Sequence, residues 1–183
     1  MKKIMFNDKY GLTQAVLDGR KTMTRREIKL TPIKKKYLDL LHYINIRNNH
    51  FFVKYAQYQI GEVVAIAQSY NVADDILPYR MWSIETYRQI EKTPGWNNKM
   101  FVKAKLMPHH IRIANIRVER LQDISYKDCT REGIKEDWSG FIVGNTAYKD
   151  IRRAFAALID KVSGKRTWNR NPWVFIYEFE LID

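Results

Sequence analysis

The sequence has little cysteine and no long apolar run. Of its 183 residues only Cys129 is a cysteine, so no disulfide can form within the chain, which fits a reducing compartment. No apolar stretch reaches the roughly 18 residues of a transmembrane helix. The chain starts with two lysines close to its N-terminus, as a signal peptide does, but too few apolar residues follow them. We therefore expect a cytoplasmic protein that does not enter a membrane.

Several familiar ligand motifs are also missing. The sequence contains no glycine-rich phosphate loop and no dinucleotide fingerprint. His109 and His110 are adjacent and would point apart in a strand, while His42 and His50 have no cysteine or carboxylate at metal-ligand spacing. Cys129 has no histidine near it in sequence, so packing explains it better than nucleophilic chemistry. We expect neither a metal nor another cofactor.

The composition is that of a folded globular protein with a basic surface. Apolar residues make up 45% of the chain, which is long enough for one domain with a substantial core. The net charge is +12, and the excess of lysine and arginine is concentrated in residues 20–36, 99–120 and 161–170. Such segregation is typical of proteins that bind a polyanion, most commonly a nucleic acid. The alternative is a basic surface that only aids solubility.

The hydrophobic pattern predicts strands interspersed with helices. Gly19 is expected to end a helix that follows the first strand, and a β-bulge near Ala114-Asn115 would reconcile the two parities of the strand that contains it. The predicted strands are residues 4–6, 63–67, 100–106, 111–121 and 173–181, and the principal predicted helices are residues 8–18, 126–132 and 148–162. This order favours an α+β fold, with a small and mostly antiparallel β-barrel as the best interpretation. We interpret residues 1–183 as one domain with insertions at about 31–59 and 71–98.

The basic octet, residues 19–26, is the most informative segment. It reads Gly-Arg-Lys-Thr-Met-Thr-Arg-Arg, and it places one amine and two hydroxyls among three guanidinium groups. Such a group can hold an anion, and a nucleic-acid phosphate is the best candidate. It can also activate a threonine hydroxyl for attack on a substrate. The residues alone leave both interpretations open.

The octet fits the pattern Gly-x-Lys-x-x-Thr-x-Arg, which resembles the signature of the ASCH domain, a relative of the PUA RNA-binding fold. The likeness to phage and prophage ASCH proteins extends over residues 4–28 and 99–182, for example in Arg117-Val118-Glu119-Arg120-Leu121 and in Trp168-Asn169-Arg170-Asn171-Pro172-Trp173. The resemblance implies a small PUA-like β-barrel with flanking helices and a cleft. The sequence differs from many phage-type relatives at residues 67–70, which read Ala-Gln-Ser-Tyr where those relatives carry Arg-Glu.

The resemblance implies RNA or a modified nucleoside as the partner, with DNA as a further possibility. A small bacterial branch of the family hydrolyses the acyl amide of N4-acetylcytidine without a metal, and its lysine, threonine and glutamate correspond to Lys21, Thr24 and Glu132. In that interpretation Thr24 is the nucleophile, Lys21 the base and Glu132 an assisting residue. Another alternative is a phage accessory protein whose basic face binds DNA or a protein partner.

A lysine can serve as a base only when it is neutral, and its ordinary pKa of about 10.4 leaves little free amine at neutral pH. Burial and the neighbouring arginines would lower that pKa, whereas a nearby Glu132 would raise it. In the binding interpretation, Lys21 and Thr24 simply contact a phosphate. Further ligand-binding candidates are the cations of the basic segments and one tryptophan between two arginines that could stack on a base: Arg20, Arg25, Arg26, Lys103, Arg166 and Trp168.

Overall fold

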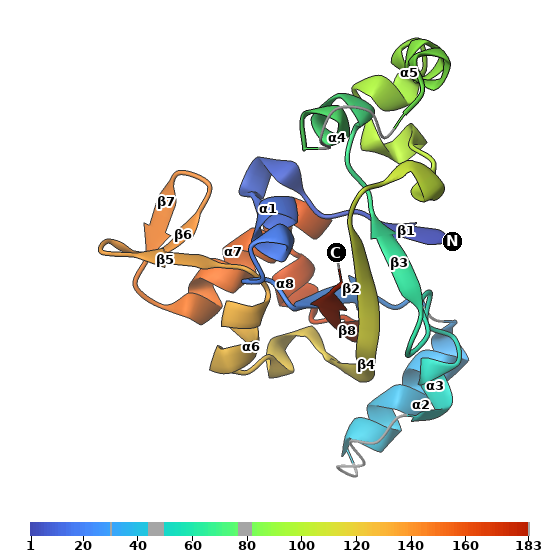
Figure 1. Ribbon diagram of the computed structural model, residues 1–183. Coiled ribbons are helices and arrows are strands. Elements are labelled where there is room, and N and C mark those ends of the chain that lie inside the picture. Colours follow the sequence, from blue (N-terminus) through green and yellow to red (C-terminus); the bar gives the residue numbers. More distant parts are fainter. Residues whose placement is uncertain (30, 44–49, 77–81, 183) are drawn as a thin grey trace.

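The computed structural model describes residues 1–29, 31–43, 50–76 and 82–182, and it has the α+β architecture expected from the sequence (Figure 1). Its main sheet has five strands, in the order β1 (Lys2–Ile4), β3 (Val63–Ile66), β4 (His110–Arg120), β8 (Trp173–Leu181) and β2 (Met23–Glu27). β1 is parallel to β3, and the other neighbours are antiparallel. In the described part of the chain no pairing joins the edge strands β1 and β2, so these ladders do not close a barrel.

The β4–β8 pair forms the centre of this sheet. The register of β4 shifts between Ile113 and Asn115, which confirms the predicted bulge. The shift allows Ile113 and Ile116, which have opposite parity in sequence, both to be buried. β8 has the predicted bounds, and its first five residues are buried on both faces of the sheet.

Four helices lie together on one side of the sheet in Figure 1: α1 (Leu12–Leu17), α6 (Tyr126–Arg131), α7 (Ile151–Ser163) and α8 (Thr167–Arg170). Asp150 caps α7 by accepting a hydrogen bond from the backbone of Arg153. The buried side of α7, which includes Phe155 and Leu158, belongs to the main hydrophobic core. This packing places α7 opposite the edge strand β2.

The sequence analysis missed a second sheet and predicted one strand wrongly. β5 (Lys135–Asp137), β6 (Gly140–Val143) and β7 (Thr146–Tyr148) form an antiparallel meander. All of β5 is exposed, so it lacks the apolar alternation that marks a half-buried strand. Residues 100–106 form no strand, because the 3₁₀ turns η3 (Lys99–Phe101) and η4 (Ala104–Leu106) fold this stretch so that Val102 packs inward while Phe101 stays exposed.

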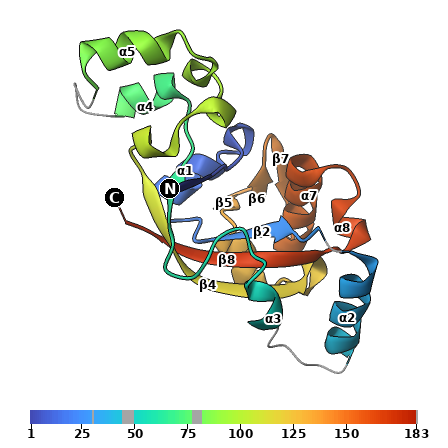
Figure 2. The same ribbon diagram turned by 90° about the vertical axis from the view of Figure 1, so that its right-hand side faces the viewer.

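The two segments interpreted as insertions lie at opposite ends of the sheet (Figure 2). The first contains α2 (Pro32–Tyr43) and α3 (His50–Val53). The second contains α4 (Tyr70–Ile76), α5 (Ile84–Glu91) and the 3₁₀ turn η2 (Pro94–Trp96). Tyr70 of α4 and Ile90 of α5 belong to a small second core, whose other members, Ala65, Ala67, Val102 and Met107, come from the chain on either side of this segment.

Two glycine turns position the basic octet. After the 3₁₀ turn η1 (Asp8–Tyr10) and α1, Gly19 adopts a φ of +70°, as a residue that ends a helix does, and the Lys21 backbone then donates to Ala15 O at 2.7 Å. The 3₁₀ turn η5 (Leu121–Asp123) precedes α6, and Gly133 follows α6 with a φ of +91°. A Cβ atom at Gly133 would lie 2.9 Å from Lys21 Cβ, so the two turns are in direct contact.

Replacing Gly133 with alanine is therefore expected to disturb Lys21. The positive φ alone costs an alanine roughly 1–2 kcal/mol, and the contact with Lys21 adds to this cost. Gly61→Ala is the matched control, because Gly61 has a φ of +81° and a Cβ atom added there would meet no atom within 4 Å. Urea denaturation should show a larger loss of unfolding free energy for Gly133→Ala than for Gly61→Ala. Equal losses would show that the two turns are not tightly packed.

Candidate functional site

A cavity of about 320 Å³ brings together three residues of the predicted site, Lys21, Thr24 and Glu132. It lies between β2, α7 and the segment that follows β1. Its lining combines polar groups with aromatic and aliphatic walls, and it also includes Asn7, Arg25, Arg26, Gln57, Phe6, Leu12, Phe155, Leu158 and Ile159. The polar residues come mainly from β2 and its flanking turn and from the end of α6, whereas α7 supplies most of the apolar wall.

The first feature of the site is a buried ion pair. Lys21 Nζ donates to Glu132 Oε2 at 2.7 Å and to the backbone oxygen of Glu132 at 2.7 Å. The two side chains are only 2% and 5% exposed. Burial lowers the pKa of Lys21; the charge of Glu132 opposes this effect, and the charges of Arg26 and Arg25 add to it.

Arg25 is the second cation on the same carboxylate. Its Nη1 donates to Glu132 Oε1 at 3.0 Å, and its Nη2 donates to Asp128 Oδ2 at 3.0 Å. Each oxygen of the Glu132 carboxylate therefore binds a different cation. The Arg25 side chain is fully buried, and its Nε has no hydrogen-bond partner among the described residues. Both terminal nitrogens of Arg25, which we predicted to bind ligand, thus bond to carboxylates inside the protein.

More charged side chains extend the ion pairs toward solvent. Arg117 binds Asp128 at 3.3 Å and Glu178 at 2.9 Å, and Arg131 binds Glu178 at 2.9 Å. Burial would raise the pKa of Glu178, but hydrogen bonds from Arg131 and Arg117 and their charges lower it overall. The sequence analysis did not assign Asp128 to the site. Its spacing of four residues before Glu132, which puts both carboxylates on one side of α6, could have indicated it.

Thr24 contributes a hydroxyl that is not used by the protein. The residue is 5% exposed and lines the cavity, and its hydroxyl makes no hydrogen bond to any residue that the structure describes. Thr22 differs, because its hydroxyl accepts a hydrogen bond from Arg131 Nε at 3.2 Å. Of the two threonines in the octet, Thr24 is the one placed to contact a ligand.

Arg26 lines the cavity, and Arg20 does not. Arg26 Nη2 donates to the backbone oxygen of Met5 at 2.6 Å, which ties β2 to the segment after β1. Arg20 is exposed and forms an ion pair with Asp18 at 3.0 Å. The octet therefore divides into groups that face the cavity and one cation that faces solvent.

The remaining predicted ligand residues lie outside this cavity. Lys103 is exposed in the segment between η3 and η4, where its backbone N–H donates to the Tyr70 hydroxyl at 2.8 Å. Arg166 is exposed at the N-cap of α8. The Trp168 ring packs edge-on against Phe155, with centroids 6.0 Å apart. The described lining of the cavity includes none of these three residues.

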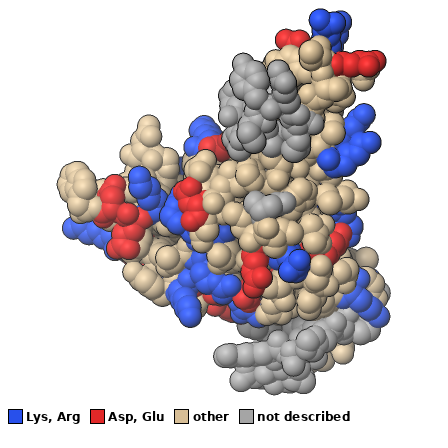
Figure 3. All heavy atoms as spheres, in the orientation of Figure 1, with Lys and Arg blue, Asp and Glu red and all other residues tan. Residues whose placement is uncertain are grey.

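The surface charge is mixed rather than gathered into one patch on the face shown in Figure 3, where Asp and Glu side chains lie among the Lys and Arg side chains.

The described residues give little support for a cysteine nucleophile or a metal site. Burial raises the pKa of the Cys129 thiol to about 11, which disfavours the thiolate. No group of three or more His, Cys, Asp or Glu side chains in the described residues could hold a metal ion. Likewise, none of the helices described is both long and apolar enough to cross a bilayer.

Glu132→Gln should destabilise the protein strongly, because Lys21 and Arg25 would remain buried without their shared negative charge. Breaking a buried ion pair in this way costs about 3 kcal/mol or more. Glu136→Gln is the matched control, since Glu136 lies exposed on β5. Urea denaturation should show the loss for Glu132→Gln and little change for Glu136→Gln. Similar stability of the two variants would contradict the ion pairs described above.

Comparison with known proteins adds little to this description. No protein-family model matches the chain, and no curated protein matches it. A similar solved structure is a crystal structure of a DUF984-family protein from Enterococcus faecalis V583. The two chains are 11% identical with a TM-score of 0.47, and the match covers 100% of this chain and 81% of that one. This similarity is too low to support any argument about function.

Proposed function

We propose that the protein binds RNA or a modified nucleoside, with one base in the cavity beside Lys21, Thr24 and Glu132. The observation that supports this proposal is that these three residues surround one cavity of about 320 Å³. Its volume falls at the lower end of the range of small-molecule sites, about 300–1,000 Å³. Phe6 and Phe155 are buried and form part of the apolar wall of this cavity, against which a base can pack. We also propose that the chain is an ASCH-like domain whose strands have a PUA-like arrangement.

The charges in the cavity favour a neutral base over a phosphate. Lys21 and Arg25 are both buried, and Glu132 binds both of them. A phosphate at this position would have to displace that carboxylate or approach it against charge repulsion. A base needs only directional hydrogen bonds, which the unused Thr24 hydroxyl and the edge of the Lys21–Glu132 pair can provide.

Nucleoside binding is measurable by isothermal titration calorimetry with cytidine and N4-acetylcytidine. Thr24→Val should weaken binding about fivefold, as expected for one lost hydrogen bond of about 1 kcal/mol. Thr22→Val is the matched control and should bind like the wild type, because the Thr22 hydroxyl is already bonded to Arg131. An absence of nucleoside binding by the wild-type protein would contradict a base site in this cavity.

A second candidate function is hydrolysis of the acyl amide of an N4-acylcytidine. The specific observation in its favour is that the Thr24 hydroxyl, which has no hydrogen-bond partner among the described residues, shares its cavity with a buried lysine whose pKa is lowered. Loss of the Lys21 proton to solvent, which the lowered pKa favours, would leave a neutral amine 2.7 Å from Glu132 and next to the substrate. The two cation contacts of Glu132 hold this carboxylate in place.

The reaction would have two steps. Lys21 takes the Thr24 proton while Oγ attacks the acyl carbon, and the C–N bond then breaks as Lys21 returns the proton to the departing N4 nitrogen. This step releases cytidine and leaves the acyl group as an ester on Thr24. Water, deprotonated by Lys21, then attacks the ester, which releases the carboxylic acid and restores the Thr24 hydroxyl.

Chromatography of N4-acetylcytidine incubated with the protein tests this candidate. Thr24→Ser should retain turnover, Thr24→Val should abolish it, and Thr22→Val should leave it unchanged. Only the neutral Lys21 amine is active, so kcat/KM should rise with pH through the pKa of Lys21, which burial lowers below its ordinary value. Turnover that persists in Thr24→Val would rule out the threonine mechanism, and nucleoside binding without any turnover would leave a binding protein.

A further inference from the structure

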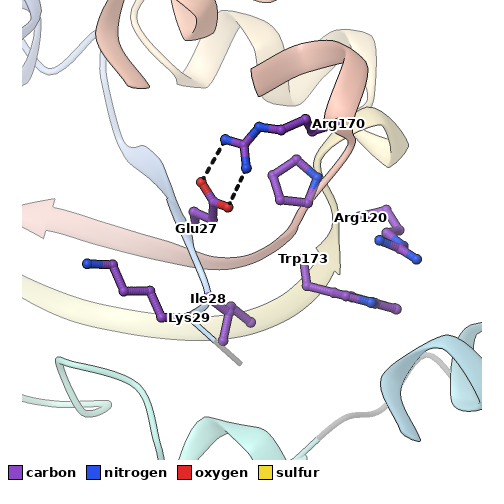
Figure 4. A pocket seen from close by; sticks show the side chains of 7 residues that line it. Glu27, Ile28, Lys29, Arg120, Arg170 and Trp173 are labelled. Atoms are coloured by element: carbon purple, nitrogen blue, oxygen red, sulfur yellow. Dashed lines mark hydrogen bonds and ion pairs between the residues drawn. The ribbon is translucent and has the colours of Figure 1, made fainter. Parts of the chain in front are cut away.

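The cavity is the first of three hollows along the edge strand β2. A second hollow, of about 440 Å³, lies between the end of β2 and the α2–α3 segment, and a third, of about 410 Å³, lies near Arg170 and Trp173 (Figure 4). Glu27 lines all three hollows. Arg26 and Gln57 are shared by the first and second, and Ile28 and Lys29 by the second and third. The second and third hollows together are called the β2 groove below.

The β2 groove is lined by more cations than anions. Its basic residues are Arg26, Lys29, Lys34, Arg120 and Arg170. Its acidic residue in the described lining is Glu27, and Arg170 binds both oxygens of that carboxylate, at 3.0 and 3.2 Å (Figure 4). The groove therefore has a net positive charge.

The cations of the groove differ in whether the protein itself already binds them. Arg120 is held by the backbone oxygen of Asn171 at 3.0 Å and by Asp39. Lys29 and Lys34 are exposed, and neither forms an ion pair with a described residue. Because no carboxylate in the described residues neutralises them, these two lysines are well placed to contact a phosphate.

Aromatic rings lie between these charges. Phe52, Tyr55, Phe175 and Tyr177 line the second hollow; Tyr55 is exposed, whereas the other three are buried and form its apolar floor. Tyr55 is 50% exposed, and Lys34 Nζ lies 4.3 Å from the centre of its ring. An exposed aromatic ring beside cations in one groove is typical of proteins that bind single-stranded nucleic acid, where bases stack and phosphates are neutralised.

We propose that the β2 groove binds the strand that flanks the base in the cavity, so that the ligand is a single-stranded nucleic acid rather than a free nucleoside. The inference rests on the proposed function. The cavity takes the base, and Lys29 and Lys34 bind neighbouring phosphates. In this arrangement the α2–α3 segment, which belongs to the insertion predicted at about residues 31–59, forms the second wall of the groove.

Fluorescence anisotropy with short labelled RNA and DNA strands, each with a central cytidine, tests this inference. A strand should bind about tenfold or more tightly than free cytidine, because its phosphates add salt-dependent contacts. Lys29→Ala combined with Lys34→Ala should lower the affinity for the strand and reduce the slope of log affinity against log salt concentration by about 1.4. The same double variant should bind free cytidine unchanged. The RNA and DNA arms decide which nucleic acid is preferred.

The matched control is Lys127→Ala with Lys149→Ala, which removes two exposed lysines outside the described lining of the groove and should change neither affinity. If the wild type binds cytidine but binds the strands no more tightly, the groove proposal fails and the nucleoside site stands. Equal effects of the two double variants would also overturn it, because binding would then depend only on net charge. If neither cytidine nor the strands bind, the proposed function itself fails.

Discussion

The Glu132 carboxylate, with one buried cation on each oxygen, is the interaction on which the site depends. Lys21 comes from the turn after α1, Arg25 from β2 and Glu132 from the end of α6. A buried lysine or arginine is tolerated only with a well-placed counter-charge, so these three elements have to meet in one arrangement. That arrangement leaves the Thr24 hydroxyl unused at the wall of a cavity, where burial lowers the pKa of Lys21.

The same interaction separates two functions that the sequence of the basic octet suggested together: binding of a phosphate backbone and recognition of, or attack on, a base. The octet carries four cations, but Lys21 and Arg25 are bound by carboxylates inside the protein, and Arg20 is bound by Asp18 at the surface. Exposed cations elsewhere, such as Lys29 and Lys34, would then attract a polyanion. In the proposed account the octet recognises or attacks a base, whereas the β2 groove binds the backbone that carries it.

The local structure that the sequence predicted well depends on strong local signals. The C-terminal strand has an apolar face over its whole length, the parity change near Asn115 requires a bulge, and Gly19 marks the end of a helix. The second sheet was missed because β5 is fully exposed, and residues 100–106 were predicted wrongly because their apolar run folds into 3₁₀ turns.

The site could be predicted only in part, for a similar reason. The family resemblance named Lys21, Thr24 and Glu132, and the structure places them around one cavity. Asp128 was missed as a partner of Arg25, and Arg117 as a partner of Asp128, because ion pairs between residues on different elements depend on tertiary packing. Trp168 was predicted from its basic neighbours to stack on a base; its edge-on contact with Phe155 is a tertiary contact that sequence neighbours cannot reveal.

The most direct test of the central claim is a crystal structure of the Thr24→Val variant with N4-acetylcytidine bound. The account predicts the base in the cavity between β2 and α7, with its acyl amide beside the substituted side chain and the Lys21–Glu132 pair intact. A nucleoside bound at another place on the protein, with this cavity filled only by water, would contradict the account.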